Sequence, residues 1–117
     1  MKKIALTLMA LAIVSIYGCG PNKLYYYGSY SNTLYEYRKD ANQETLARHM
    51  KELENIIAES KEEGKRVPPG LYGELGYLHM KSNDNVKAVN FFNLEKQIYP
   101  ESTILIDRLI KQTNKDS

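Results

Sequence analysis

The sequence predicts an all-α protein: a short tetratricopeptide-like array of antiparallel helix hairpins that follows a cleaved signal peptide and a tyrosine-rich collar. Three observations predict this organisation. A short apolar run precedes the only cysteine, apolar residues recur every three or four positions over 46–60, and residues 69–102 match a 34-residue helical repeat. A chain of 117 residues is long enough for one domain.

Residues 1–18 have the parts of a bacterial signal peptide. Lys2 and Lys3 give the start of the chain a positive charge, and the apolar run 4–16 follows them. A membrane anchor cut short by the following glycines is the alternative. The run is too short to cross about 30 Å of hydrocarbon comfortably as a permanent helix. Its length and its flanks are typical of a secretory signal.

The only cysteine, Cys19, directly follows this segment. Ile16–Cys19 resembles the bacterial lipobox, in which a small residue, here Gly18, precedes the cysteine that receives lipid; Tyr17 is bulkier than the usual middle residue. A lone cysteine cannot form an internal disulfide. We therefore predict that Cys19 is lipidated. Because Gly20 rather than aspartate follows it, the usual sorting pattern predicts the periplasmic face of the outer membrane.

Cleavage before Cys19 would make the protein nearly neutral. Subtracting 18 residues from 117 leaves 99, and the loss of Lys2 and Lys3 lowers the basic count from 16 to 14, against 14 acidic residues. Nucleic-acid binding needs a basic face or stripe, so this balance argues against it. It also assigns membrane attachment to the lipid rather than to charge.

Residues 19–41 form a lipid tether and the collar. Ser31 is a plausible N-cap, and the spacing of apolar residues predicts a short helix over 31–39. Three interpretations of the collar stay open: packing over the following helices, a partner-binding surface, and contact with the bilayer interface. The candidate partner-binding residues are its tyrosines: Tyr25, Tyr26, Tyr27, Tyr30, Tyr35 and Tyr37.

Residues 42–113 form the predicted helical domain, which opens with a long amphipathic helix over 43–63. Asn42 is a suitable N-cap, and Gly64 and the prolines of the loop 65–70 end the helix. Its apolar stripe steps by four, three, four and three residues. The stripe consists of Leu46, Met50, Leu53, Ile57 and Ser60.

The repeat over 69–102 predicts helices over 70–81 and 85–98, of which the first pairs with the long helix. Small residues at Gly76 and Ala88 would let the two helices approach closely. The other matching positions are Tyr72, Leu75, Phe92 and Pro100. His79 and Glu95 depart from the repeat, and Glu95 predicts a looser contact with the next helix.

A final helix over 103–112 is predicted to begin at Ser102 as its N-cap. The polar residues from Thr113 onward are expected to fray. One repeat cannot bury its own apolar faces, so the long helix and this final helix are expected to cover it.

Sequence patterns that would indicate catalysis or metal binding are missing. The two histidines lie in no zinc motif, and no phosphate-binding glycine motif occurs. We expect His49 to lie on the polar side of the long helix, exposed to water, and His79 to be packed. The chain is therefore predicted to be no enzyme and to use no cofactor, metal or small-molecule substrate.

Several stretches of the chain resemble an uncharacterised family of small Gram-negative lipoproteins with a tetratricopeptide-like body. The two longest are Leu24–Tyr37 and Val67–Tyr77, and two shorter ones are Phe92–Pro100 and Asp107–Leu109. Members are typically encoded beside a lipoprotein similar to the curli-secretion channel protein. The resemblance implies a non-enzymatic interaction or assembly accessory of an outer-membrane secretion or envelope complex, and that channel-like lipoprotein as its partner. The alternative is a periplasmic activator of, or enzyme acting on, cell-wall material.

Overall fold

The computed structural model describes residues 23–115, and every regular element within that range is a helix. The predicted all-α fold is confirmed there. The predicted signal peptide and Cys19 lie outside the described residues. The elements are α2 (Tyr30–Lys39), α3 (Gln43–Glu62), α4 (Leu71–Lys81), α5 (Asn85–Ile98), the short 3₁₀ turn η1 (Pro100–Ser102) and α6 (Thr103–Lys115).

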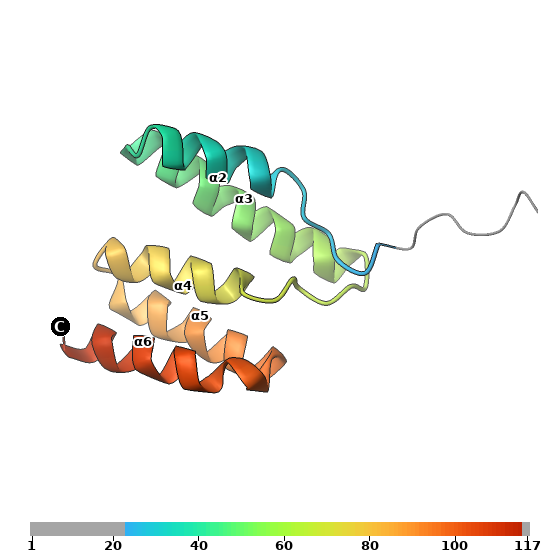
Figure 1. Cartoon of the computed structure of the whole chain (residues 1–117). Helices are drawn as coiled ribbons and strands as arrows, with labels where there is room; N and C mark the ends of the chain where they lie inside the picture. Colours follow the sequence, from blue (N-terminus) through green and yellow to red (C-terminus); the bar gives the residue numbers. More distant parts are fainter. Residues whose placement is uncertain (1–22, 116–117) are drawn as a thin grey trace, which may run out of the picture.

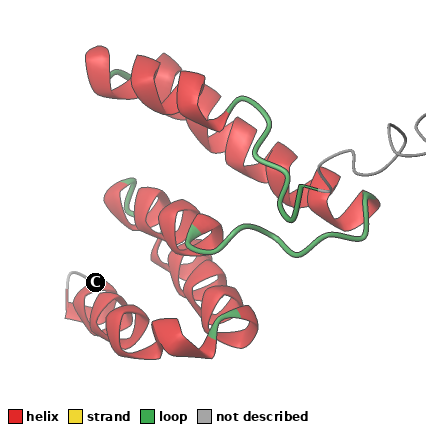
Figure 2. Cartoon of the chain, turned by 45° about the vertical axis from the view of Figure 1, so that its right-hand side comes forward, coloured by secondary structure: helices red, strands yellow, loops and turns green. Residues whose placement is uncertain are grey.

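Consecutive helices run antiparallel, so each one packs beside its neighbours in the chain (Figure 1). This alternation brings the end of α3, the start of α4, the end of α5 and the start of α6 to one end of the helical body. The first described residues, Lys23 and Leu24, also lie there, beside the loop after α3, and we call this end the tether end. Helix α2 is shorter than α3 and lies beside its first half, while the segment before α2 runs along the second half (Figure 2).

Helix α3 begins as predicted. The Asn42 side chain accepts a hydrogen bond from the Thr45 amide at 2.9 Å, and the Asn42 amide donates to the Thr45 hydroxyl at 3.1 Å. This capping box satisfies two backbone donors at the start of the helix. The buried face of α3 joins α4 in the larger core cluster, which confirms the predicted pairing. That cluster comprises Leu53, Ile56, Ile57, Val67, Leu71, Tyr72, Leu75 and Leu78.

Helices α4 and α5 cross closely at Gly76, as the repeat pattern predicts. A Cβ atom added there would lie 2.7 Å from a ring carbon of Phe92 and 3.0 Å from the Ala88 carbonyl oxygen. Both neighbours are fully buried, so neither has space to withdraw. Phe92 and Ala88 also belong to the second core cluster, in which Ile106 of α6 covers the repeat.

The predicted start of the first helix is wrong by one residue and has a different cap. Helix α2 begins at Tyr30, and Ser29 rather than Ser31 is its N-cap, without a side-chain cap hydrogen bond. The Ser29 amide instead donates to a carboxylate oxygen of Glu52 in α3, at 2.7 Å. A partner distant in the sequence thus replaces the local cap.

The end of the chain also differs from the prediction. Ser102 belongs to η1, and its hydroxyl donates to the Tyr99 carbonyl oxygen at 2.7 Å instead of capping α6. Thr113 is not frayed. It is fully buried within α6, and its hydroxyl donates to the Leu109 carbonyl oxygen at 2.8 Å. Burial against the preceding helices extends α6 to Lys115.

Glu95 has a role that the repeat pattern does not indicate. Its side chain is buried, and its two carboxylate oxygens accept hydrogen bonds from the backbone amides of Gly70 at 2.7 Å and Gly73 at 3.2 Å. These amides lie at the start of α4, where a negative charge is favoured by the helix dipole. Glu95 of α5 therefore caps α4 from outside.

Candidate functional site

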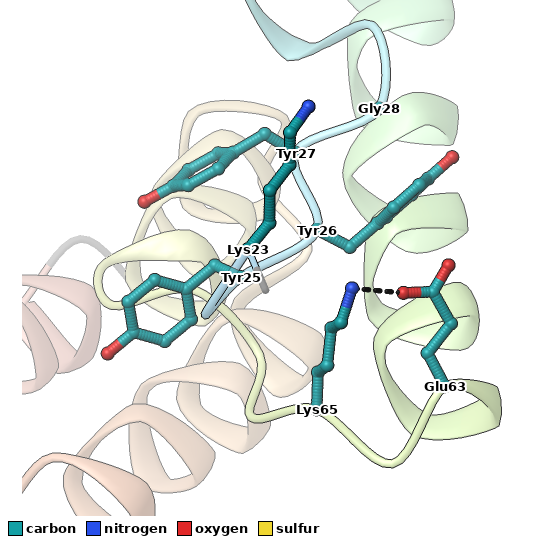
Figure 3. Close-up of a pocket in the computed structure, with 7 residues that line it drawn as sticks. All are labelled: Lys23, Tyr25, Tyr26, Tyr27, Gly28, Glu63 and Lys65. Carbon is teal, nitrogen blue, oxygen red and sulfur yellow. Dashed lines mark ion pairs between the residues drawn. The ribbon is translucent and has the colours of Figure 1, made fainter. Parts of the chain in front are cut away.

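The collar divides into an inner and an outer set of tyrosines. Its first three tyrosines lie in a non-helical segment, where successive side chains point in opposite directions. Figure 3 shows Tyr26 directed toward α3, and Tyr25 and Tyr27 directed away from it. The rings of Tyr25 and Tyr27 contact edge to face, with centroids 6.3 Å apart.

The inner tyrosines are Tyr26, Tyr30 and Tyr37, which are partly buried against the larger core cluster. The outer set includes Tyr27, which is 47% exposed, and Tyr35, which is 64% exposed. Packing therefore accounts for the inner set. The partner and bilayer interpretations remain open for the outer tyrosines and for the partly buried Tyr25.

A cavity of about 420 Å³ lies at the tether end, beneath the start of the collar (Figure 3). The Lys65 ammonium forms an ion pair with the Glu63 carboxylate at 2.6 Å. The residues that line this cavity are Lys23, Tyr25, Tyr26, Tyr27, Gly28, Glu63 and Lys65. A second cavity of about 370 Å³ shares Lys23 and Lys65 and is completed by Leu24, Gly64 and Arg66.

The loop between α3 and α4 is attached to the end of α5. The Arg66 guanidinium lies 4.6 Å from the Tyr99 ring centroid and donates to the Ile98 carbonyl oxygen at 2.6 Å. The Tyr99 hydroxyl donates to the Val67 carbonyl oxygen at 2.6 Å. Burial and a hydrogen bond with Tyr25 raise the pKa of Tyr99 to about 12. These contacts fix the wall beside the two cavities.

A buried polar network joins α2, α3 and α4. His49 Nδ1 lies 2.8 Å from the Thr33 hydroxyl oxygen, and its Nε2 lies 2.9 Å from one carboxylate oxygen of Glu74. The Tyr30 hydroxyl donates to the other carboxylate oxygen of Glu74 at 2.7 Å. The Tyr37 ring stacks on the imidazole at a centroid distance of 6.2 Å.

The prediction that His49 is exposed to water is wrong, because its side chain is fully buried. Both ring nitrogens have protein partners, which removes most of the cost of burying an imidazole. A second stripe in the sequence could have indicated this burial. His49, Leu53, Ile56 and Ser60 step by four, three and four residues, and all four side chains are buried.

The ionisation of Tyr30 is displaced within this network. Burial, together with the hydrogen bond to Glu74 and the negative charge of that carboxylate, raises the pKa of Tyr30 to about 12. The Tyr30 hydroxyl therefore stays protonated well above neutral pH and keeps α2 bonded to α4. A cavity of about 260 Å³ reaches this pair beside Pro69, Gly70 and Leu71.

Other groups that could carry chemistry are dispersed. His79 is packed as predicted, with its ring stacked on Phe91 at a centroid distance of 5.4 Å. Within residues 23–115, no three histidine, cysteine, aspartate or glutamate side chains gather as a metal site. No helix in the same range is both long and apolar enough to cross a bilayer.

Comparison with known proteins assigns the chain to a family. A family model described as a domain of unknown function, DUF4810, matches residues 24–109. The chain therefore belongs to the DUF4810 family. The matched range includes the collar tyrosines, the buried network and every lining residue of the two cavities at the tether end except Lys23. No curated protein and no solved structure matches the chain significantly.

Proposed function

We propose that this member of the DUF4810 family is a non-enzymatic outer-membrane lipoprotein that serves as an interaction or assembly accessory of a secretion or envelope complex. Lipid on Cys19 would hold it at the periplasmic face of that membrane. The resemblance to small Gram-negative lipoproteins supports this proposal, as does the signal-like start of the chain.

The observation that carries the proposal is a rigid body that leaves aromatic rings exposed. Tyr35 and Tyr27 project from the collar with about half or more of their surface in water. Tyrosine is enriched among residues that dominate protein–protein binding. Because Tyr30 and Tyr37 anchor α2 to the core, the outer rings are presented without a large ordering cost.

The proposed partner is a second envelope lipoprotein of the curli-secretion-channel-like type. Two proteins anchored to the same membrane meet at a raised effective concentration, so a modest contact surface is sufficient. The segment before α2 and α2 itself extend along α3 (Figure 1), and they carry Tyr27 and Tyr35 respectively.

A pulldown after crosslinking in intact cells tests the proposal. Tyr27→Ala combined with Tyr35→Ala should reduce recovery of the lipoprotein partner and leave the melting temperature nearly unchanged, because both rings are largely exposed. Tyr77→Ala is the matched control, since Tyr77 is 44% exposed on α4, outside the collar. Tyr26 and Tyr30 are poor choices because their loss would disturb the core.

The identity of the captured proteins distinguishes the alternatives. Undiminished recovery with the double variant would contradict the role of the outer tyrosines. Capture of cell-wall enzymes in place of an envelope lipoprotein would favour the second candidate, an activator of cell-wall enzymes.

A further inference from the structure

We propose that the tether end of the helical body is itself a membrane-docking surface, at which Lys23 and Lys65 contact the phosphates of phospholipid headgroups. The inference rests on the proposed lipidation of Cys19. It adds a second contact with the membrane, and it orients the body so that the tether end faces the bilayer.

The length of the tether carries the first part of the argument. Four peptide steps separate Cys19 from Lys23. A fully extended chain covers about 3.3–3.6 Å per residue, so Lys23 can lie at most about 14 Å from the lipidated cysteine. Helix α3 has 20 residues and, at 1.5 Å per residue, is about 30 Å long. The tether therefore holds one end of the body near the headgroups and leaves the other free to extend away.

The side chains at this end suit that location. Leu24 is 72% exposed next to the tether, and Ile104 and Leu105 are 74% and 62% exposed at the start of α6. Tyr25 lines the first cavity at the same end and is partly buried, and tyrosine is enriched at membrane–water interfaces. The fourth large aliphatic side chain of comparable exposure among the described residues, Val86 at 75%, lies at the opposite end, so three of these four belong to segments at the tether end.

The charges at the tether end also complement the phosphates of phospholipid headgroups. The two cavities at the tether end share Lys23 and Lys65, and Arg66 lines one of them. Glu63 is the one acidic residue in either lining, and its ion pair with Lys65 is partly exposed. Exposed ion pairs contribute little to stability, so Lys65 can exchange Glu63 for a phosphate at small cost. The near-neutral total charge conceals this local basic surface.

The proposed phosphate-binding surface is confined to these two cavities, because acidic residues lie around them. Glu62 and Glu101 also lie at the tether end, outside both linings. Arg66 is less available than the lysines, because it donates to the Ile98 carbonyl oxygen and stacks on Tyr99. The two lysines are therefore the residues to test, and Arg66 is best left unchanged to preserve the loop.

The test measures how far each end of the lipidated protein lies from the membrane. Lipidation consumes the thiol of the only cysteine, so a single introduced cysteine can carry a fluorophore. Gln97→Cys places it near the tether end and Gln112→Cys near the opposite end, both at exposed positions. The protein is reconstituted into vesicles of phosphatidylethanolamine and phosphatidylglycerol that contain a headgroup-linked quencher.

We expect stronger quenching at position 97 than at position 112. Lys23→Glu combined with Lys65→Glu should reduce that difference, because both cavities then repel phosphate and only the tether still holds this end near the membrane. Lys81→Glu with Lys115→Glu is the matched control: it changes net charge equally at the opposite end and should preserve the difference. A melting curve verifies that each variant is folded. If the Lys23→Glu, Lys65→Glu variant unfolds, Lys23→Gln with Lys65→Gln replaces it.

Equal quenching at the two positions, or a difference that the lysine substitutions leave unchanged, would overturn the docking surface. Protein that carries no lipid and does not remain with the vesicles would instead refute the proposed lipoprotein function. The two failures are therefore distinguishable.

Discussion

Individual residues in this protein are constrained by how closely backbones approach. Gly76 and Gly73 lie one helical turn apart on α4, yet their surroundings differ. A methyl group at Gly73 would meet the Ile106 side chain at 3.5 Å, an ordinary contact, whereas at Gly76 it would overlap the buried Phe92 ring. The same chemical change thus has opposite consequences at two neighbouring glycines.

Gly76→Ala should destabilise the protein, because overpacking a close contact costs about 1–3 kcal/mol and outweighs the gain of up to about 1 kcal/mol in helix propensity. Gly73→Ala should be neutral or stabilising, because it keeps that gain without the overlap. Thermal unfolding of both variants measures the difference. Equal melting temperatures would mean that α4 and α5 do not cross at Gly76.

At the scale of elements, α2 depends on its neighbours. It has 10 residues, and isolated helices shorter than about 12–15 residues are only marginally stable in water. Its inward side chains supply what local propensity does not: Thr33 contacts His49 of α3, and Tyr30 donates to Glu74 of α4. The buried network therefore attaches α2, and with it the collar, to the rest of the helical body.

The network predicts how stability depends on alkaline pH. The pKa of Tyr30 is raised to about 12 in the folded protein, against 10.0 for an unperturbed tyrosine. The folded state therefore holds this proton more tightly. The stability that it contributes is fully present below pH 10 and is lost as the pH rises toward 12. Denaturant midpoints measured across this range should fall.

Two tyrosine variants test which side chains cause this loss of stability at alkaline pH. Tyr30→Phe should be less stable than the unsubstituted protein at neutral pH, because Glu74 loses a donor, but should show a shallower decline at alkaline pH. Tyr99→Phe should remove a comparable part of the decline, since the pKa of Tyr99 is also raised to about 12. A Tyr30→Phe variant with an unchanged alkaline slope would contradict the assignment.

At the scale of the whole molecule, the alternating direction of the helices determines which segments meet the tether. The loop between α3 and α4 and the turn between α5 and α6 lie at the same end, where Arg66 and Val67 contact Ile98 and Tyr99 (Figure 1). The proposed anchor at Cys19 would therefore give the body a defined membrane-facing end.

Cys19→Ser should abolish lipid labelling and leave an unprocessed precursor, because a hydroxyl cannot replace the thiol that receives the diacylglyceryl group. Metabolic labelling with a fatty acid and the electrophoretic mobility of the protein measure both effects. The helical body should keep its melting temperature, since the substitution lies outside the family match at 24–109. Mature, lipid-labelled protein from this variant would refute the localisation.

Helix ends that carry local signals could be predicted from the amino-acid sequence. Asn42 caps α3 through residues within three positions, Gly64 and the prolines end it, and the small residues at 76 and 88 indicate the closest helix contact. These features depend on neighbours along the chain, so pattern and residue type are sufficient to predict them.

The long-range polar contacts could not be predicted in this way. His49 and Glu74 are 25 positions apart, Tyr30 and Glu74 are 44 apart, and Glu95 reaches back 25 positions to cap α4. Each of these polar groups could equally have remained in water. What buries them is the arrangement of three helices around one core, and that arrangement also separates inner from outer tyrosines. Local patterns carry no information about such partners, because burial and hydrogen bonding at long range are properties of the assembled fold.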